Sequence, residues 1–220
     1  MKQQFESVRS GFLLLLAAFI WGIAFVAQSV GMDYMGPCTF NGARFFIGGV
    51  VLLPVIWTKE RMEEKKGATG APAKKKKSGA LLPGGICCGI ALCAASLLQQ
   101  FGIRYTSVGK AGFLTTLYIV IVPLFGLIVH KTVTKLQWLS VFIAAVGMYF
   151  ICITENFSVN YGDMIILACA CFFALHIITI ERFSVLVDGV RMSLLQFAVC
   201  GILSCLLYTS PSPRDMRRSR

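Results

Sequence analysis

The residues of this chain that could bind a solute or move a proton are polar side chains placed well inside long apolar stretches. A polar group taken out of water costs free energy unless it makes a hydrogen bond. Each of these side chains therefore needs a partner on another helix, a water molecule or a ligand. Their amide, hydroxyl, guanidinium and imidazole groups suit solute binding and proton transfer. In chain order they are Gln28, Arg44, Gln100, Thr115, Thr116 and His176.

Arg44 lies about seven residues into an apolar stretch that begins near residue 38, which is roughly 10 Å at 1.5 Å per helical residue. If this stretch crosses a bilayer, an Arg near the centre costs ~2.5–3.5 kcal/mol on insertion scales. Two interpretations follow. The side chain extends toward the outer boundary, with Asn41 one turn above it on the same face, or it lines a solute cavity.

Gln100 shares a helical face with Ser96 and Arg104 at the end of another apolar stretch. Amides of this kind often bond a neighbouring membrane helix, and the alternative is solute binding. Thr115 and Thr116 likewise either bond back to their own helix or contribute to a site.

Trp21, Phe25 and Gln28 follow helical spacing and form one face of the first span. This face, with its two aromatic residues, fits either packing or a pocket. His176 could relay protons, because its unperturbed pKa is near 6.5, or could simply bond a neighbouring helix. Pro123 lies inside an apolar run and removes a backbone hydrogen bond there. We therefore expect it to act as a hinge.

Signatures of catalysis, of a metal site and of nucleic-acid binding are missing. Gly109-Lys110 is no phosphate loop, because Arg104 precedes it where a Gly is needed and Ala111 follows it where Ser or Thr is needed. The cysteines lack the spaced partners of a zinc site, and the basic segment 59–77 has no interleaved aromatic residues. We expect no enzyme, no cofactor, no metal and no nucleic-acid partner.

Composition predicts an all-α polytopic membrane protein. Of 220 residues, 56% are hydrophobic and only 14% are charged, which is far more apolar than a soluble domain. Several stretches reach the ~18 residues that a spanning helix needs, and none shows the alternation of barrel strands. The seven predicted spans cover residues 11–30, 38–57, 80–103, 109–129, 136–153, 162–181 and 191–207.

The distribution of basic residues predicts the orientation. Loops 58–79 and 130–135 carry Lys and Arg, whereas loops 31–37 and 154–161 carry none. Basic loops stay in the cytoplasm, so the N-terminus is expected there. The four Arg after residue 207 contradict that pattern. We therefore expect 208–220 to be a non-native, disordered tail.

A weak internal repeat appears at an offset of 152 residues. It places Trp21-Gly22 on Phe173-Ala174, Arg44-Phe45 on Gln196-Phe197 and Gly49 on Gly201. Five spans precede the repeat point, and because this number is odd the second copy would be inverted in the bilayer. We divide the chain into a first repeat, 1–155, and the beginning of a second, 156–207.

Several segments together resemble the EamA-type family of the drug/metabolite transporter superfamily. They are WGIAFVAQ in the first span, Arg44-Phe45 in the second, IRYTSVGKAGFLTTLYIVIVPLFG, LQWLSVFIAAVGMYFI and YGDMIILACACFFALHI. The resemblance covers residues 10–206. It implies a ten-helix permease of the bacterial inner membrane, built from two inverted five-helix repeats, of which seven helices are present here.

The resemblance also implies a central cavity, to which this chain would contribute Trp21, Gln28, Gln100, Thr115, Thr116 and Tyr118, with Arg44 nearby. One departure is His130-Lys131, which stands where the family often has Gly-Glu, so no role of that acid transfers. We expect a secondary transporter of metabolites, amino acids or drugs that works by alternating access, with a homodimer as a possible assembly. The alternatives are an inert truncated fragment and a seven-helix receptor, although the seventh span lacks the Lys that a retinal Schiff base needs.

Overall fold

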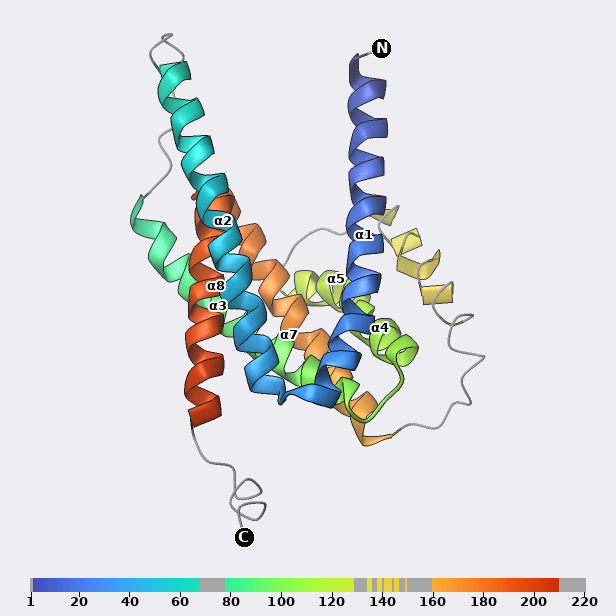
Figure 1. The fold of residues 1–220 in the computed structure, drawn as a ribbon. Helices are drawn as coiled ribbons and strands as arrows, with labels where there is room; N and C mark the ends of the chain where they lie inside the picture. Colours follow the sequence, from blue (N-terminus) through green and yellow to red (C-terminus); the bar gives the residue numbers. More distant parts are fainter. Residues whose placement is uncertain are drawn as a thin grey trace.

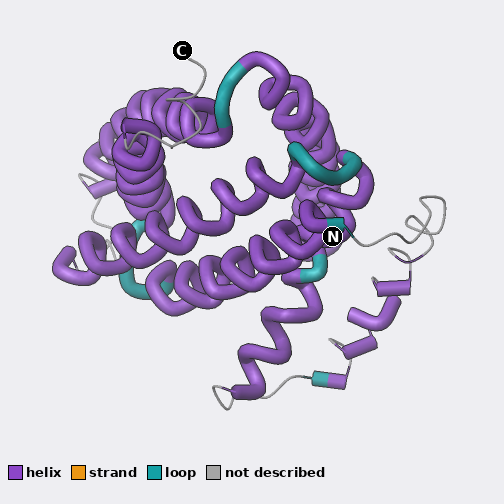
Figure 2. Tube along the Cα trace, turned by 90° about the horizontal axis from the view of Figure 1, so that it is seen from below, coloured by secondary structure: helices purple, strands orange, loops and turns teal. Residues whose placement is uncertain are grey.

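The computed structural model describes residues 2–67, 78–128 and 160–209, together with scattered positions between 134 and 149. Throughout these residues the regular structure is helical and contains no strand (Figure 2). The prediction of an all-α fold is therefore confirmed. The elements are α1 (Lys2–Tyr34), α2 (Pro37–Gly67), the 3-10 turn η1 (Ser78–Ala80), α3 (Leu81–Ile103), α4 (Val108–Thr116), α5 (Tyr118–Ile128), α7 (Tyr161–Ser184) and α8 (Gly189–Thr209).

Six stretches of the described residues are long and apolar enough to cross a membrane: Val8–Tyr34, Pro37–Met62, Leu81–Ile103, Val108–Leu127, Tyr161–Ser184 and Gly189–Tyr208. They match six of the seven predicted spans to within a few residues. The remaining predicted span, 136–153, falls largely outside the described residues, as does the predicted tail 208–220 apart from its first two residues, which belong to α8. The described helices are those of a multi-pass membrane protein.

Helix α3 lies at the centre of the packing, between α7 and α8. Helix α2 packs along α8, while α4 and α5 pack on α7 (Figure 1). Helix α1 touches α2, α3 and α4. Among the side chains of α1 that the structure describes, the buried ones are Phe25, Gln28 and Met32, which lie in its C-terminal half. The N-terminus of α1, the C-terminal end of α2 and the start of α8 lie at one end of the bundle, opposite the start of α7 (Figure 1).

Glycines allow the central helices to approach closely. A Cβ on Gly85 would lie 2.3 Å from the side chain of Leu195, and one on Gly89 would lie 2.6 Å from Cβ of Val199. Both contacts join α3 to α8. On the opposite side of α3, Gly102 meets Gly162 of α7, where a Cβ on Gly162 would lie 2.9 Å from the Gly102 carbonyl oxygen.

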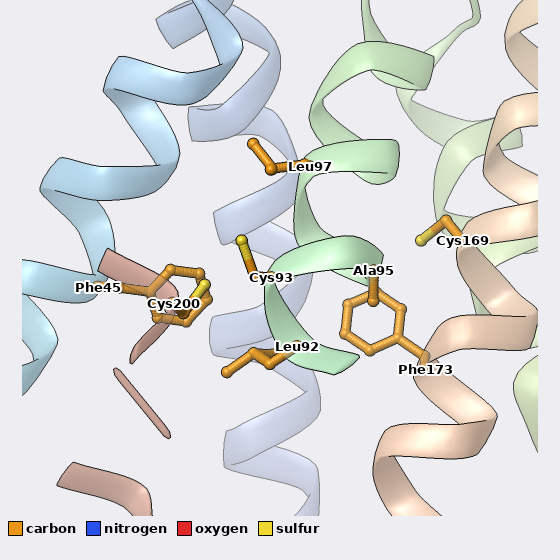
Figure 3. Packing of buried hydrophobic residues seen from close by; sticks show 8 residues of the cluster. All are labelled: Phe45, Leu92, Cys93, Ala95, Leu97, Cys169, Phe173 and Cys200. Atoms are coloured by element: carbon orange, nitrogen blue, oxygen red, sulfur yellow. The ribbon is translucent and has the colours of Figure 1, made fainter. Parts of the chain in front are cut away.

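The main hydrophobic core joins α2, α3, α7 and α8, and Figure 3 shows its side chains meeting around the middle of α3. Its members are Phe45, Leu92, Cys93, Ala95, Leu97, Cys169, Phe173 and Cys200. The cysteines serve here as small apolar residues. This core holds the buried polar side chains of the neighbouring helical turns in place.

Candidate functional site

Gln28 and Gln100 are buried amides that have unpaired polar atoms in the described part of the chain. Gln28 is 2% exposed, and its Oε1 has no partner among the described residues. Gln100 is fully buried, and neither its Nε2 nor its Oε1 has one. An unpaired buried polar group costs ~1–3 kcal/mol. Helices α1 and α3 therefore hold unfilled hydrogen-bonding groups at two of the predicted cavity positions.

The adjacent amide, Gln99, behaves differently. Its Nε2 donates to Oγ1 of Thr115 over 3.3 Å, and both side chains are buried. This bond ties α3 to α4. The sequence draws attention to Gln99 and Gln100 together, but a helix turns about 100° per residue, so the two face different neighbours. Thr115 is thus brought to the interior, with a hydrogen-bond partner that the sequence alone does not reveal.

The fourth span is interrupted between α4 and α5. Thr116 donates from its Oγ1 to the carbonyl oxygens of Gly112 and Phe113, a pattern that often bends helices. Regular helix stops at Thr116, and Leu117 forms the turn before Tyr118 begins α5. Pro123 lies inside α5, so the break precedes it by six residues. The hinge role of Pro123 stays a prediction, and Leu117 is a second position where the span can bend.

Tyr118 and Trp21 have contrasting surroundings. Tyr118 is half-buried and packs against the core, with its ring 6.3 Å from that of Phe173 on α7. Trp21 is 47% exposed on α1 and lies about two helical turns before Gln28 on the same face. His176 is buried and bonds Oε1 of Gln196 over 3.0 Å, which is the neighbouring-helix contact expected as the alternative to a proton relay.

A polar network joins α2 to α8 around Asn41. The Nδ2 of Asn41 donates to Oγ of Ser204 over 2.9 Å and approaches Sγ of Cys200 at 3.7 Å. Its Oδ1 accepts a hydrogen bond from Arg44 over 3.0 Å. The Arg44 guanidinium also lies 4.8 Å from the centre of the Phe45 ring. Asn41 and Arg44 stand out in the sequence as polar residues within an apolar stretch. That Ser204 and Cys200 contact Asn41 could not be predicted from the sequence.

Ion pairs hold the two ends of the bundle. At one end Lys110 of α4 contacts Asp163 of α7 over 3.1 Å, with side chains 14% and 7% exposed. Asp163 also accepts from the hydroxyl of Thr106 and from the backbone of Asn160, whose side chain caps α7 in return. At the opposite end Lys59 of α2 pairs with Asp188.

A second ion pair accompanies Lys59 and Asp188 at that end. Arg191 pairs with Glu60 over 2.6 Å, with side chains 53% and 44% exposed. The side chain of Asp188 also accepts from the backbone of Val190 and Arg191 and so caps α8. This end is therefore held by more exposed pairs than the Lys110 end.

An apolar groove of about 910 Å³ runs between α2 and α8. Phe45, Phe197 and Leu194 are among the side chains that line it. None of the predicted cavity residues does. Its lining offers no charge or amide with which to select a polar solute, so the groove is separate from the buried amides.

Comparison with known proteins decides the family. Residues 9–153 match the model of the EamA-like transporter family. The chain belongs to this family. It is also 32% identical over 192 residues to a protein of Archaeoglobus fulgidus named as an uncharacterized transporter, an alignment that covers 87% of this chain and 55% of the relative. No solved structure matches.

Membership in the EamA-like family confirms the resemblance that the sequence motifs indicate. The chain spans about half the length of its curated relative. The family and the relative's name support a membrane transporter in general. The buried amides, the broken fourth span and the ion pairs at both ends are the features from which a mechanism can be argued.

Proposed function

We propose that the chain forms part of a secondary permease for small molecules, working by alternating access around a polar site at Gln28 and Gln100. The observation that carries the proposal is the unfilled hydrogen-bonding capacity of Gln100, a fully buried amide. Proteins rarely leave such groups unpaired, so each invites an explanation. A solute that bonds the amide during transport would supply the partner.

The interrupted fourth span supports movement beside this site. Transporter sites are commonly built where spanning helices are discontinuous. The break at Leu117 follows directly after Thr115 and Thr116, and Thr115 is joined to the Gln99-Gln100 turn of α3. Bending at Leu117 or Pro123 would move the outer part of the fourth span relative to α3.

Contacts between α2 and α8 support the inverted repeat. At the offset of 152 residues, Phe45 corresponds to Phe197, and their ring centroids lie 5.3 Å apart. The contact of Gly49 with Leu194 likewise corresponds to that of Gly201 with Gly42. Contacts that repeat when the two partners are exchanged are the mark of a two-fold relation. The division at residue 155 stays a prediction.

The ion pairs supply a physical basis for alternating access. Lys110 and Asp163 close one end, and Lys59 with Asp188 closes the other. A solute path from one side to the middle requires one of these groups to separate while the other stays closed. In this proposal the N-terminus lies in the cytoplasm of a bacterial cell, with the Lys59 pair on the inner side.

Gln100→Met is the decisive variant. It removes an unpartnered amide and keeps the volume, so we expect the melting temperature of the purified protein to rise by a few degrees. We expect transport to be lost at unchanged membrane abundance, because the solute loses its hydrogen bonds. The measurement compares metabolites inside and outside cells that produce the wild type or the variant, by mass spectrometry.

Gln99→Met is the matched control. It leaves Thr115 buried without the Gln99 amide, so the melting temperature should fall. A lower melting temperature for Gln100→Met would mean that Gln100 is structural. If wild-type cells show no metabolite redistribution of threefold or more relative to cells without the protein, the permease proposal is overturned.

A further inference from the structure

We infer that Arg44 forms an anion subsite that holds the carboxylate of the transported solute. This inference rests on the proposed function and deepens it, because it names an acidic small molecule as the substrate class. It is carried by the position of the guanidinium, by the neutrality of its partners and by the network that orients it.

The guanidinium belongs to the membrane interior. Arg44 lies seven residues after Pro37 at the start of α2, about 10 Å along the helix. It is half-buried and shares a face with the buried side chains of Asn41 and Phe45. Ile47 and Val51, one and two turns further along the same side of α2, are exposed, so Arg44 lies at the boundary between the interior side of α2 and its exposed side. The side chain nevertheless turns toward the interior, because it contacts the buried residues Asn41 and Phe45.

The protein partners of Arg44 are neutral. Within the described residues it makes one hydrogen bond, to Oδ1 of Asn41, and one ring contact, with Phe45. A guanidinium has five N–H donors, so most of them stay available. A positive charge inside a membrane is costly without a counter-charge. Neither an amide oxygen nor an aromatic face supplies a full negative charge.

No carboxylate of the described residues forms an ion pair with Arg44. Asp163, Asp188 and Glu60 form their ion pairs at the two ends of the bundle. The apolar stretches of α2, α3 and α8 contain no Asp or Glu. A ligand carboxylate would therefore bring the missing charge, and the planar guanidinium matches it with two parallel hydrogen bonds.

The Asn41 network prepares Arg44 for this task. Ser204 accepts from Nδ2 of Asn41 over 2.9 Å and donates to the carbonyl oxygen of Cys200 over 2.8 Å. With Nδ2 engaged on α8, Oδ1 is turned toward Arg44. The guanidinium is consequently held in one orientation before a ligand arrives, which reduces the ordering that binding requires.

The test measures binding to the full chain purified in a neutral detergent. The probes are acetate, benzoate, phenylacetate and indole-3-acetate, each compared with its primary amide, which has nearly the same shape without the charge. Affinities come from melting-temperature shifts over a concentration series. We expect at least one acid to bind the wild type ten times or more tightly than its amide.

Two variants assign that preference to Arg44. Arg44→Gln should lose the preference for the acid by a factor of ten or more. Arg44→Lys should keep part of it, because the charge remains and the two-pronged geometry is lost. Should Arg44→Gln fail to fold, the acid-to-amide ratio of the wild type and its reduction in Arg44→Lys still decide the matter.

A further experiment distinguishes a lipid phosphate from a solute carboxylate as the partner of Arg44. If lipid phosphate is the true partner, nanodiscs of phosphatidylglycerol will stabilise the wild type more than nanodiscs of phosphatidylcholine, in a manner that depends on Arg44, and no acid will exceed its amide. That outcome overturns the inference, as does equal binding of acids and amides to the wild type. Gln100-dependent transport without any preference for acids would overturn this subsite alone and leave the permease proposal standing.

Discussion

Asp163→Asn is expected to lower the melting temperature of the purified protein by on the order of 10 °C. The change removes the negative charge that faces Lys110 where both side chains are largely buried. Breaking such a buried pair from one side costs ~3–5 kcal/mol. For a chain of about this size each kcal/mol corresponds to roughly 2–4 °C, so the two ranges together give about 6–20 °C, which includes the expected shift.

Several elements depend on this one carboxylate. Through Lys110 it joins α7 to α4, and through Thr106 it joins α7 to the turn between α3 and α4. It also accepts a hydrogen bond from the backbone of Asn160 at the start of its own helix. An Asn at this position keeps one oxygen acceptor but loses the charge-assisted bonds, which are roughly twice as strong as neutral ones. Thermal unfolding in detergent, followed by loss of helical circular dichroism, measures the effect.

Glu60→Gln provides the matched control at the opposite end. Its partner Arg191 is 53% exposed, and solvent-exposed pairs contribute only ~0–1 kcal/mol. We expect a shift of no more than about 4 °C. Equal effects of Asp163→Asn and Glu60→Gln would contradict the view that the Lys110 end is the more tightly closed of the two.

Gly162→Val should prevent α3 and α7 from packing and should reduce the yield of folded protein severely. A Cβ at this position would lie 2.8 Å from the backbone carbonyl carbon of Tyr105 and 2.9 Å from the carbonyl oxygen of Gly102. Side chains can repack, but these are backbone atoms and cannot move without separating the helices. Overpacking typically costs ~1–3 kcal/mol and sometimes more. Size-exclusion chromatography and melting temperature report the outcome.

Substitutions at two other glycines, which have more space around them, serve as comparisons for Gly162→Val. In Gly85→Ala the nearest atoms to the new Cβ all belong to the Leu195 side chain, at 2.3–2.8 Å, so we expect a loss of stability smaller than that caused by Gly162→Val. Gly112→Ala meets nothing within 4 Å and should be neutral or slightly stabilising, because Ala is a better helix former by ~1 kcal/mol. If Gly162→Val folded as well as Gly112→Ala, the close packing of α3 on α7 would be disproved.

These contacts suggest a division of labour within the bundle. Close glycine packing ties α3 to both α7 and α8, so α3 serves as the rigid centre. The fourth span has a one-residue turn at Leu117 and is held at its N-terminal end by the Lys110 pair. In the proposed mechanism the fourth span therefore moves while α3 stays, and the unpaired amide of Gln100 belongs to the element that stays.

The candidate site was only partly predictable. Apolar stretches with isolated polar residues identify Gln28, Arg44, Gln100 and Thr115 as unusual, since each must be satisfied or used. The interpretation of each depends on its neighbours. Thr116 bonds back to its own helix, whereas the hydroxyl of Thr115 accepts from Gln99. Two adjacent threonines with the same local pattern thus have different surroundings.

The sequence by itself determined the helical spans, because a bilayer core offers backbone groups no partner outside the helix and every spanning stretch must be both apolar and long enough. The family followed from motifs within those spans. Only the tertiary structure decided which polar groups meet, because partners such as Lys110 with Asp163 and Asn41 with Ser204 come from different helices. Helix rotation and packing bring such groups together, and they leave Gln100 without a partner among the described residues.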